Sequence, residues 1–231
     1  MTHSDNYAPE SLSSVLGAIA RTLQAEPDVE TTLGAIVKAA VDHVDGAEYA
    51  GISLVEDGRI RAVAPTSEVV PMIDEIQHRT GQGPCLDAIA RHDVFRTGNR
   101  LDERRWPAFA PDAAETGIRS MLSYRLFILH DTLGALNLYS TQVDAFSDRT
   151  EKDGKEFATH AAIALAGAQT EAQLHAAIES RDVIGMAKGI LMQRHDLDPV
   201  QAFRLLVESS QASNLKLHDV AAWLVGHRRE L

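Results

Sequence analysis

The chain has little cysteine and few aromatic residues, and it lacks long apolar runs. Cys85 is the only cysteine among 231 residues, which excludes an internal disulfide and a multi-thiolate zinc site. No run of about 18 apolar residues predicts a transmembrane helix, and the polar first ten residues lack the apolar core of a secretory signal. Hydrophobic residues make up 45% of the chain, which excludes a disordered or fibrous protein. We therefore expect a cytoplasmic protein with an ordinary folded core and no membrane contact.

Charge is unevenly distributed along the chain. The formal net charge is −11. From Ala176 to the C-terminus seven basic residues balance seven acidic ones, which leaves 15 basic and 26 acidic residues in the rest of the chain. An acidic first part and a neutral tail predict two modules with different surfaces. Only the tail is suited to contacts with phosphates.

Apolar periodicity predicts an α+β first part, in which helices flank two hairpins. The expected helices are 10–25, a second one capped by Asp28, 67–79 up to Gly81, 86–91 and a piece that begins at Arg105-Trp106-Pro107. The expected strands are 47–55 and 59–64 around an Asp57-Gly58 turn, Val94-Phe95, and the hairpin 120–130 with 133–140 around Asp131-Thr132. This order predicts an antiparallel sheet with helices on its faces.

The amino-acid composition of the chain changes at Ser147 or Asp148. The chain up to His195 has no proline and is rich in alanine, and one helix of about 47 residues would be roughly 70 Å long. A pattern of this length is typical of a coiled coil or of a helix shared between domains. Asp148 and Glu151 have the spacing of a capping box. Gly154 and Gly167 interrupt the pattern either as hinges or as sites of close helix packing.

Two short helices are predicted after the long one. Asp198-Pro199 is a strong helix start, after which Phe203, Leu206 and residues 207 and 210 share a face. Asn214 is expected to cap the last helix, and the stripe from Leu217 to Leu224 gives this helix an apolar side. The end of the long helix and these two helices form a plausible three-helix module.

Residues 181–225 resemble the ANTAR domain, an RNA-binding module of bacterial transcription antiterminators. The resemblance is carried, in the family's order, by R-D-V-I-G-M-A-K-G-I-L-M-Q-R from Arg181, A-F-R-L-L from Ala202 and N-L-K-L-H-D-V-A from Asn214. It implies a homodimer held by a coiled coil, and binding to paired RNA hairpins in nascent transcripts that prevents a terminator from forming. Asp196 stands where glycine is expected in a left-handed conformation, and Trp223 is bulkier than the aliphatic residue expected there.

Residues 28–168 look like a GAF domain, and the order GAF before ANTAR is similar to actinobacterial regulators. The segments that carry this resemblance are Gly51-Ile-Ser, Gly81-Gln-Gly-Pro-Cys-Leu86, Arg105-Trp-Pro107, Ser120 to Leu126 and Gly134-Ala-Leu-Asn-Leu-Tyr139. The resemblance implies a pocket for a small ligand over one sheet face, or a domain that only dimerises. The N-K-F-D-E signature of cyclic-nucleotide-binding members is absent.

The candidate RNA contacts lie in the tail. Arg181, Gly185 and Lys188 fall on one helix face and could follow a phosphate backbone, or could form a solvated charged face. Trp223 beside Lys216 and His227 could stack on a base, or could pack against the coiled coil. The full set of predicted RNA-binding residues is Arg181, Gly185, Lys188, Arg194, Arg204, Asn214, Lys216 and Trp223.

The candidate ligand contacts of the first part are Cys85, Arg79, Tyr124 and Asn137. Cys85 follows Gly-Pro at an expected helix start, where the helix dipole would lower a thiol pKa; the alternative is a small buried core residue. Arg79 and Arg105 could meet an anionic ligand or pair with the many acids. No histidine pair has metal-binding spacing, no catalytic motif is present, and the sequence identifies no cofactor.

These patterns predict a GAF sensor domain with an N-terminal helix over 1–147, a coiled-coil helix over 148–178 and an ANTAR RNA-binding domain over 179–231. The predicted function is transcription antitermination under control of a signal, without catalysis. Two alternatives stay open. One is a GAF-based redox or sulfoxide-reducing enzyme that uses Cys85, although such enzymes use more than one cysteine. The other is a DNA-binding regulator, which the balanced tail charge disfavours.

Overall fold

The computed structural model describes residues 29–56, 58–91, 94–99 and 103–227. The predicted helix over 10–25 and the cap at Asp28 lie outside these residues, as does Asp57. The chain divides into two compact units, Met1–Gln169 and Thr170–Leu231.

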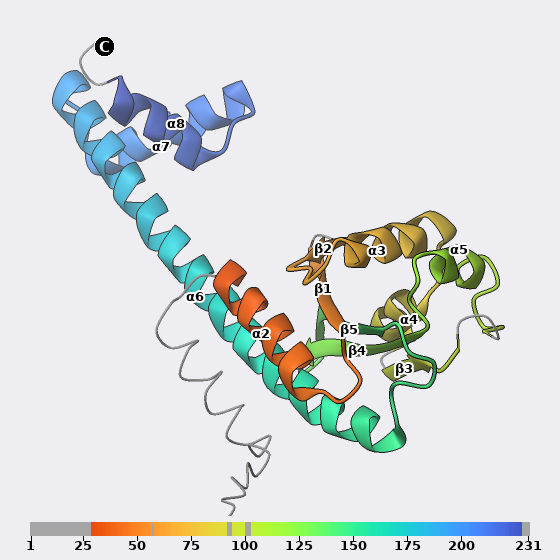
Figure 1. Ribbon diagram of the computed structural model, residues 1–231. Coiled ribbons are helices and arrows are strands. Elements are labelled where there is room, and N and C mark those ends of the chain that lie inside the picture. Colours follow the sequence, from red (N-terminus) through yellow and green to blue (C-terminus); the bar gives the residue numbers. More distant parts are fainter. Residues whose placement is uncertain (1–28, 57, 92–93, 100–102, 228–231) are drawn as a thin grey trace, which may run out of the picture. The chain divides into compact units, whose positions relative to one another are not determined.

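The first unit is an antiparallel sheet between two layers of helices (Figure 1). Its strands are β1 (Tyr49–Glu56), β2 (Arg59–Val63), β3 (Val94–Thr97), β4 (Ser120–Ile128) and β5 (Asp131–Ser140), in the order β2-β1-β5-β4-β3. Its helices are α2 (Val29–His43), α3 (Val69–Thr80), α4 (Pro84–Arg91), α5 (Ala110–Glu115) and the first part of α6 (Asp148–His195). The predicted α+β class is confirmed.

Strand alternation gives each sheet face its own core, because successive side chains point to opposite faces. Ile52, Leu122 and Leu138 face α2 and α6, where they pack with Ile36 and Phe157. The opposite face packs against α3, α4 and α5, through a second cluster that includes Val70, Cys85, Phe109, Met121 and Tyr139. The predicted ligand contacts Tyr124 and Cys85 therefore lie on opposite faces of the sheet.

The second unit is a three-helix module built from the end of α6, α7 (Pro199–Ser213) and α8 (Leu217–Gly226). Its core consists of small and aliphatic side chains from all three helices: Ala187, Leu191, Ala202, Leu206, Ala221 and Leu224. Asp196 takes the left-handed conformation expected of it, with φ 50°. Asp198 caps α7 by accepting from the backbone N–H groups of Val200 and Gln201, so the predicted start of α7 is confirmed.

The long helix α6 runs over 48 residues without interruption, Gly154 and Gly167 included. Its first turn is capped by Ser147, whose Oγ accepts from the backbone N–H of Thr150 at 3.1 Å. The capping box predicted at Asp148 is therefore wrong by one residue. Asp148 instead lies inside the first turn.

Three other boundaries differ from the predicted ones. The β4–β5 turn lies at Leu129 and His130, because Asp131 already begins β5. The helical piece expected from Arg105 begins at Ala110, after a turn in which the Trp106 carbonyl accepts from residues 109 and 110. Asn214 ends α7 in a left-handed conformation and does not cap α8; Lys216 stands at that N-cap.

Candidate RNA-binding surface and candidate ligand-binding face

The end of α6 presents the predicted phosphate contacts to solvent. Arg181 and Gly185 are exposed and Lys188 is half-buried. Neither cation forms an ion pair within the described part of the chain. With Ile184 and with Phe203 of α7, these residues line an open groove of about 520 Å³. The helix face that the sequence singled out is therefore one wall of a concave surface.

Phe203 lies at the surface of the second unit. Its side chain is 42% exposed, whereas Ala202 and Leu206 beside it are buried. The Lys188 ammonium lies 5.9 Å from the centroid of the Phe203 ring, within the range of a cation–π contact. The apolar pattern of the sequence predicts a face shared by Phe203 and Leu206, and no sequence signal marked Phe203 as a functional residue. The groove therefore contains an aromatic ring and two cations from two helices.

A second exposed aromatic side chain lies on α8. Trp223 is 55% exposed and stacks on His227, with ring centroids 4.6 Å apart. Both alternatives given above, stacking on a base and packing against the coiled coil, require this exposed ring. Lys216 is exposed at the start of α8. This helix thus offers an aromatic pair to a partner.

The remaining predicted contacts divide into two kinds. Arg194 in the last turn of α6 and Arg204 on α7 are exposed, as a phosphate contact requires. Asn214 is also exposed, but its backbone amide is hydrogen-bonded to the carbonyls of Gln211 and Ser210. Asn214 therefore has a structural reason to be there, because asparagine tolerates the left-handed conformation.

The sheet face beneath α3 and α4 contains a buried polar cluster that includes two predicted ligand contacts. Asn137 Nδ2 donates to Ser53 Oγ at 3.0 Å, and Ser123 Oγ donates to Asn137 Oδ1 at 2.8 Å. The Cys85 thiol of α4 donates to Ser53 Oγ at 3.3 Å. Cys85 and Asn137 are thus brought together through Ser53, which binds both.

Asp74 of α3 extends this cluster. Its Oδ1 accepts from the Tyr139 hydroxyl at 3.1 Å and from Gln77 Nε2 at 3.3 Å, while Gln77 Oε1 accepts from the backbone N–H of Cys85 at 2.9 Å. Asp74 Oδ2 is buried and has no hydrogen-bond partner among the described residues. Burial raises the pKa of Asp74 to about 7, against the smaller effect of the two hydrogen bonds. This carboxyl is thus set to titrate near neutral pH.

Cys85 does not have the environment of a reactive thiol. It lies in the first turn of α4, which begins at Pro84, but its side chain is only 2% exposed. Burial raises the pKa of its thiol to about 12, and the nearby Asp74 adds to the rise. The expectation of a lowered pKa is therefore wrong, because desolvation outweighs any effect of the helix terminus.

The other two predicted ligand contacts lie elsewhere. Tyr124 points to the opposite sheet face, where its hydroxyl donates to the Glu151 carbonyl at 3.0 Å. Arg79 is exposed and forms an ion pair with Asp112 at 2.6 Å. Arg105 likewise pairs with Glu103, so both arginines pair with acids, which is the alternative that the sequence left open.

Five members of the buried polar cluster were not predicted from the sequence: Ser53, Asp74, Gln77, Ser123 and Tyr139. A signal for three of them was present. Ser53, Ser123 and Tyr139 interrupt or end apolar strands at positions that alternate with core residues, and polar residues at such positions share a face with Asn137. Asp74 and Gln77 had no such signal, because their burial depends on where α3 packs.

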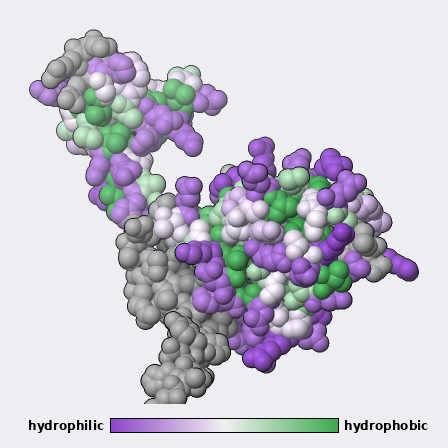
Figure 2. Space-filling model, viewed as in Figure 1, coloured by the Kyte–Doolittle hydropathy of each residue, from purple (hydrophilic) through white to green (hydrophobic). Residues whose placement is uncertain are grey.

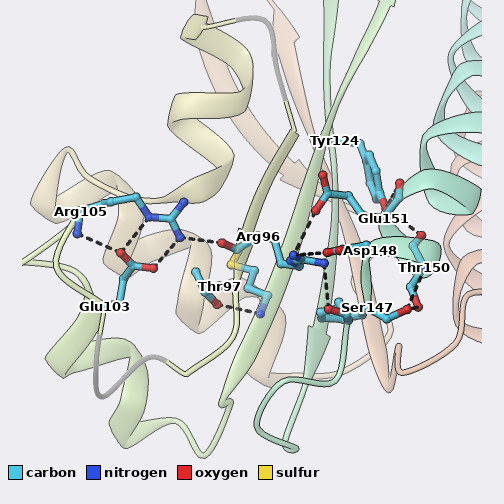
Figure 3. Close-up of polar contacts among 11 residues, drawn as sticks. Arg96, Thr97, Glu103, Arg105, Tyr124, Ser147, Asp148, Thr150 and Glu151 are labelled. Carbon is cyan, nitrogen blue, oxygen red and sulfur yellow. Dashed lines mark hydrogen bonds and ion pairs between the residues drawn. The ribbon is translucent and has the colours of Figure 1, made fainter.

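The edge strand β3 is fastened to the start of α6 by Arg96 (Figure 3). Its guanidinium donates to Asp148 Oδ1 at 2.7 Å and to the Phe146 carbonyl at 3.2 Å, and lies 3.4 Å from Glu151 Oε2. Since Tyr124 of β4 bonds to the same turn, two neighbouring strands hold the first turn of α6.

Neither a metal site nor a membrane span is found in the described ranges. No cluster of three or more His, Cys, Asp or Glu side chains there has the arrangement of a metal site. None of the described helices combines the length and apolar character that crossing a bilayer requires.

Family models identify both halves of the chain. A model of the GAF domain matches residues 26–166, and a model of the ANTAR domain matches residues 172–225. Because the first match covers more than half of the chain, the chain belongs to the GAF domain family. The ANTAR domain that follows makes it a GAF–ANTAR regulator, in which an RNA-binding antitermination module is combined with a sensor domain.

Solved structures share the fold of the first unit. The GAF domain of a phosphoenolpyruvate-protein phosphotransferase from Coxiella burnetii has a TM-score of 0.57 at 16% identity, over 70% of this chain and 96% of that one. Free methionine-R-sulfoxide reductase from Neisseria meningitidis, in complex with its substrate, has 0.56 at 16%, over 73% and 99%. At these identities the likeness concerns the fold alone. No curated protein sequence matches the chain.

Proposed function

We propose that this protein binds hairpins in nascent transcripts through the second unit and thereby prevents transcription termination, under control of a signal sensed by the GAF domain. The observation that carries the proposal is the pair Arg181 and Lys188, seven residues apart on α6 and without ion pairs among the described residues. Unpaired cations at this spacing are suited to successive phosphates, and binding them releases counterions from the nucleic acid.

The GAF part of the proposal rests on the cluster around Asn137. A small ligand that entered between α3, α4 and the sheet would meet the hydroxyl of Ser53, the amide of Asn137 and the carboxyl of Asp74. These groups offer donors and acceptors, as ligand-orienting groups do. Chemistry at Cys85 is disfavoured, because the thiol is buried and its pKa is raised.

We further propose a homodimer held by α6. Near the start of the second unit this helix exposes Leu174 and Ile178, at 59% and 52%, one turn apart on the same side. Exposed aliphatic side chains at this spacing favour pairing with the same helix of a second copy. The predicted coiled-coil segment, 148–178, ends where Arg181 begins the charged face.

The test is binding to a hairpin RNA library with a fixed stem and a randomised loop, compared with duplex DNA of equal length. We expect the protein to retain some hairpins and to prefer them to the duplex. The Arg181→Ala, Lys188→Ala double variant should bind the selected hairpin more weakly, with a slope of log affinity against log salt reduced by roughly two.

The matched control replaces two exposed cations of α6 in the first unit, as Lys152→Ala with Lys155→Ala. The control double variant has the same change of net charge and should keep the wild-type slope. Preference for the duplex would favour the DNA-binding alternative. An unchanged slope in the Arg181, Lys188 variant would assign both residues to a solvated face.

A further inference from the structure

Resting on the proposed RNA binding, we propose that the groove between α6 and α7 holds one unpaired base of the hairpin loop. The base stacks on Phe203, and its neighbouring phosphates meet Arg181 and Lys188. The inference adds Phe203 as a determinant of which RNA is bound and gives Gly185, already a predicted RNA contact, a defined role in shaping the groove.

The shape of the groove depends on Gly185. This glycine lies inside a helix, where glycine is less favourable than alanine. A Cβ added at Gly185 would meet nothing within 4 Å, so packing inside the described chain does not require the glycine. A missing side chain in the wall of a groove leaves room for something outside the chain to approach the helix backbone.

The chemistry of the groove suits a flat aromatic partner. The exposed Phe203 ring offers a surface for stacking, and the Lys188 ammonium lies 5.9 Å from its centroid. Single-stranded nucleic acids are bound by this combination, in which bases stack on aromatic rings while cations follow the backbone. A base inside an A-form stem is already stacked and unreachable, so the groove selects an unpaired one.

The charge of the groove selects an anionic partner and disfavours a second copy of the chain. Arg181 and Lys188 line it and no acidic residue does, although the chain as a whole has a net charge of −11. A parallel pair of α6 helices meeting on this face would place Arg181 against Arg181 of the other copy. The cations of the groove therefore suit a nucleic acid, whereas the exposed aliphatic side chains of the dimer segment do not.

The test uses the single hairpin that the wild-type protein selects most strongly from the fixed-stem, randomised-loop library. Phe203→Leu keeps an apolar side chain but removes the ring, and Phe203→Tyr restores a ring. We expect Phe203→Leu to weaken binding roughly 5- to 150-fold without changing the salt slope, because no phosphate contact is lost, and Phe203→Tyr to bind nearly as the wild type does.

Gly185→Ala gives a second, independent arm. The added methyl narrows the groove, so RNA affinity should fall, while the helix becomes more stable because alanine favours it. Gly189→Ala is the matched control: Gly189 is also exposed on α6 with no atom near its Cβ position, but it does not line the groove. This control should become more stable and keep its RNA affinity.

Removal of single bases identifies the partner of Phe203. Replacing each loop nucleotide by an abasic one should reveal a position at which the wild type loses affinity and Phe203→Leu loses nothing further.

If the wild type selects no hairpin, the proposed function fails. If it selects one, but Phe203→Leu binds like wild type, or Gly185→Ala and Gly189→Ala behave alike, the groove assignment is wrong. A change of oligomeric state with unaltered RNA affinity would make the groove a dimer surface and would also overturn it.

Discussion

The buried surroundings of Asp74 give its carboxyl an unusually high pKa. An aspartate is ordinarily ionised at neutral pH, but here the carboxyl is 4% exposed and one of its oxygens has no partner among the described residues. Burial raises its pKa from 3.8 to about 7. The folded state thus keeps a proton that the unfolded state releases above pH 4.

This difference makes the first unit less stable as the pH rises. The stability that protonated Asp74 contributes is fully present below pH 4 and is lost as the pH rises through about 7, at about 1.4 kcal/mol per pH unit. Asp74→Asn removes the charge but keeps an oxygen for Tyr139. We expect this variant to gain about 2–3 kcal/mol relative to the wild type between pH 5 and pH 8.

Urea unfolding followed by Trp106 fluorescence, in a Trp223→Phe background, would measure this gain in the first unit. Trp106 is buried in the core beneath the same sheet face. Asp112→Asn, at an exposed carboxylate paired with Arg79, serves as the control and should change little. If the difference in unfolding free energy between Asp74→Asn and the wild type does not vary with pH, the account is contradicted.

Individual site residues were predictable only where strand alternation determines them. Asn137 and Cys85 do share one environment, but Tyr124 was grouped with them although it is adjacent to Ser123 and therefore on the other face. The environment of Cys85 depends on how closely α4 packs against the sheet, which no local pattern encodes. Its thiol pKa could not be inferred from the helix start alone.

At the scale of elements, α6 is the feature that the sequence predicted best. Its length, its end at His195 and the start of α7 at Asp198-Pro199 follow from local signals such as absent proline and capping side chains. Asn214 shows the limit of such signals, because asparagine suits both a helix N-cap and a left-handed C-terminus. The left-handed conformation of Asn214 and the bonds from its backbone N–H to the Gln211 and Ser210 carbonyls assign it to the end of α7.

Gly154 is a packing residue of α6. A Cβ there would lie 2.7 Å from the Tyr124 ring carbon that bears the hydroxyl, and Tyr124 is held by hydrogen bonds to the same helix. Gly154→Ala should therefore destabilise the first unit by about 1–3 kcal/mol. Gly167→Ala, with no atom near its Cβ position, should be neutral or stabilising. Urea unfolding compares the two, and equal effects would contradict the packing role.

The exposed segment of α6 leads to a prediction about assembly. Light scattering at micromolar concentration should give a dimer, and Leu174→Asp with Ile178→Asp should shift it to monomer, because like charges would replace an apolar contact. Ala176→Asp, about half a turn away from both residues, is the control and should stay dimeric. A monomeric wild type would contradict the proposed dimer.

At the scale of the whole molecule, the two units have different surfaces and different tasks. The acidic charge is concentrated before Ala176, and the proposed RNA contacts lie in the ANTAR domain. A ligand of the GAF domain changes RNA affinity only by its differential affinity for two states of the chain. Typical coupling of about 1–3 kcal/mol would alter RNA binding 5- to 150-fold.

The most direct test of the proposed function is transcription in vitro across a terminator whose stem shares bases with the selected hairpin. Bound protein should stabilise the hairpin and thereby prevent the terminator stem, which shares its bases, from forming. The wild type is expected to increase the fraction of full-length transcript, and the Arg181→Ala, Lys188→Ala variant to leave it near the level without protein. Termination that the wild type does not change, or that the variant relieves equally well, would contradict the account.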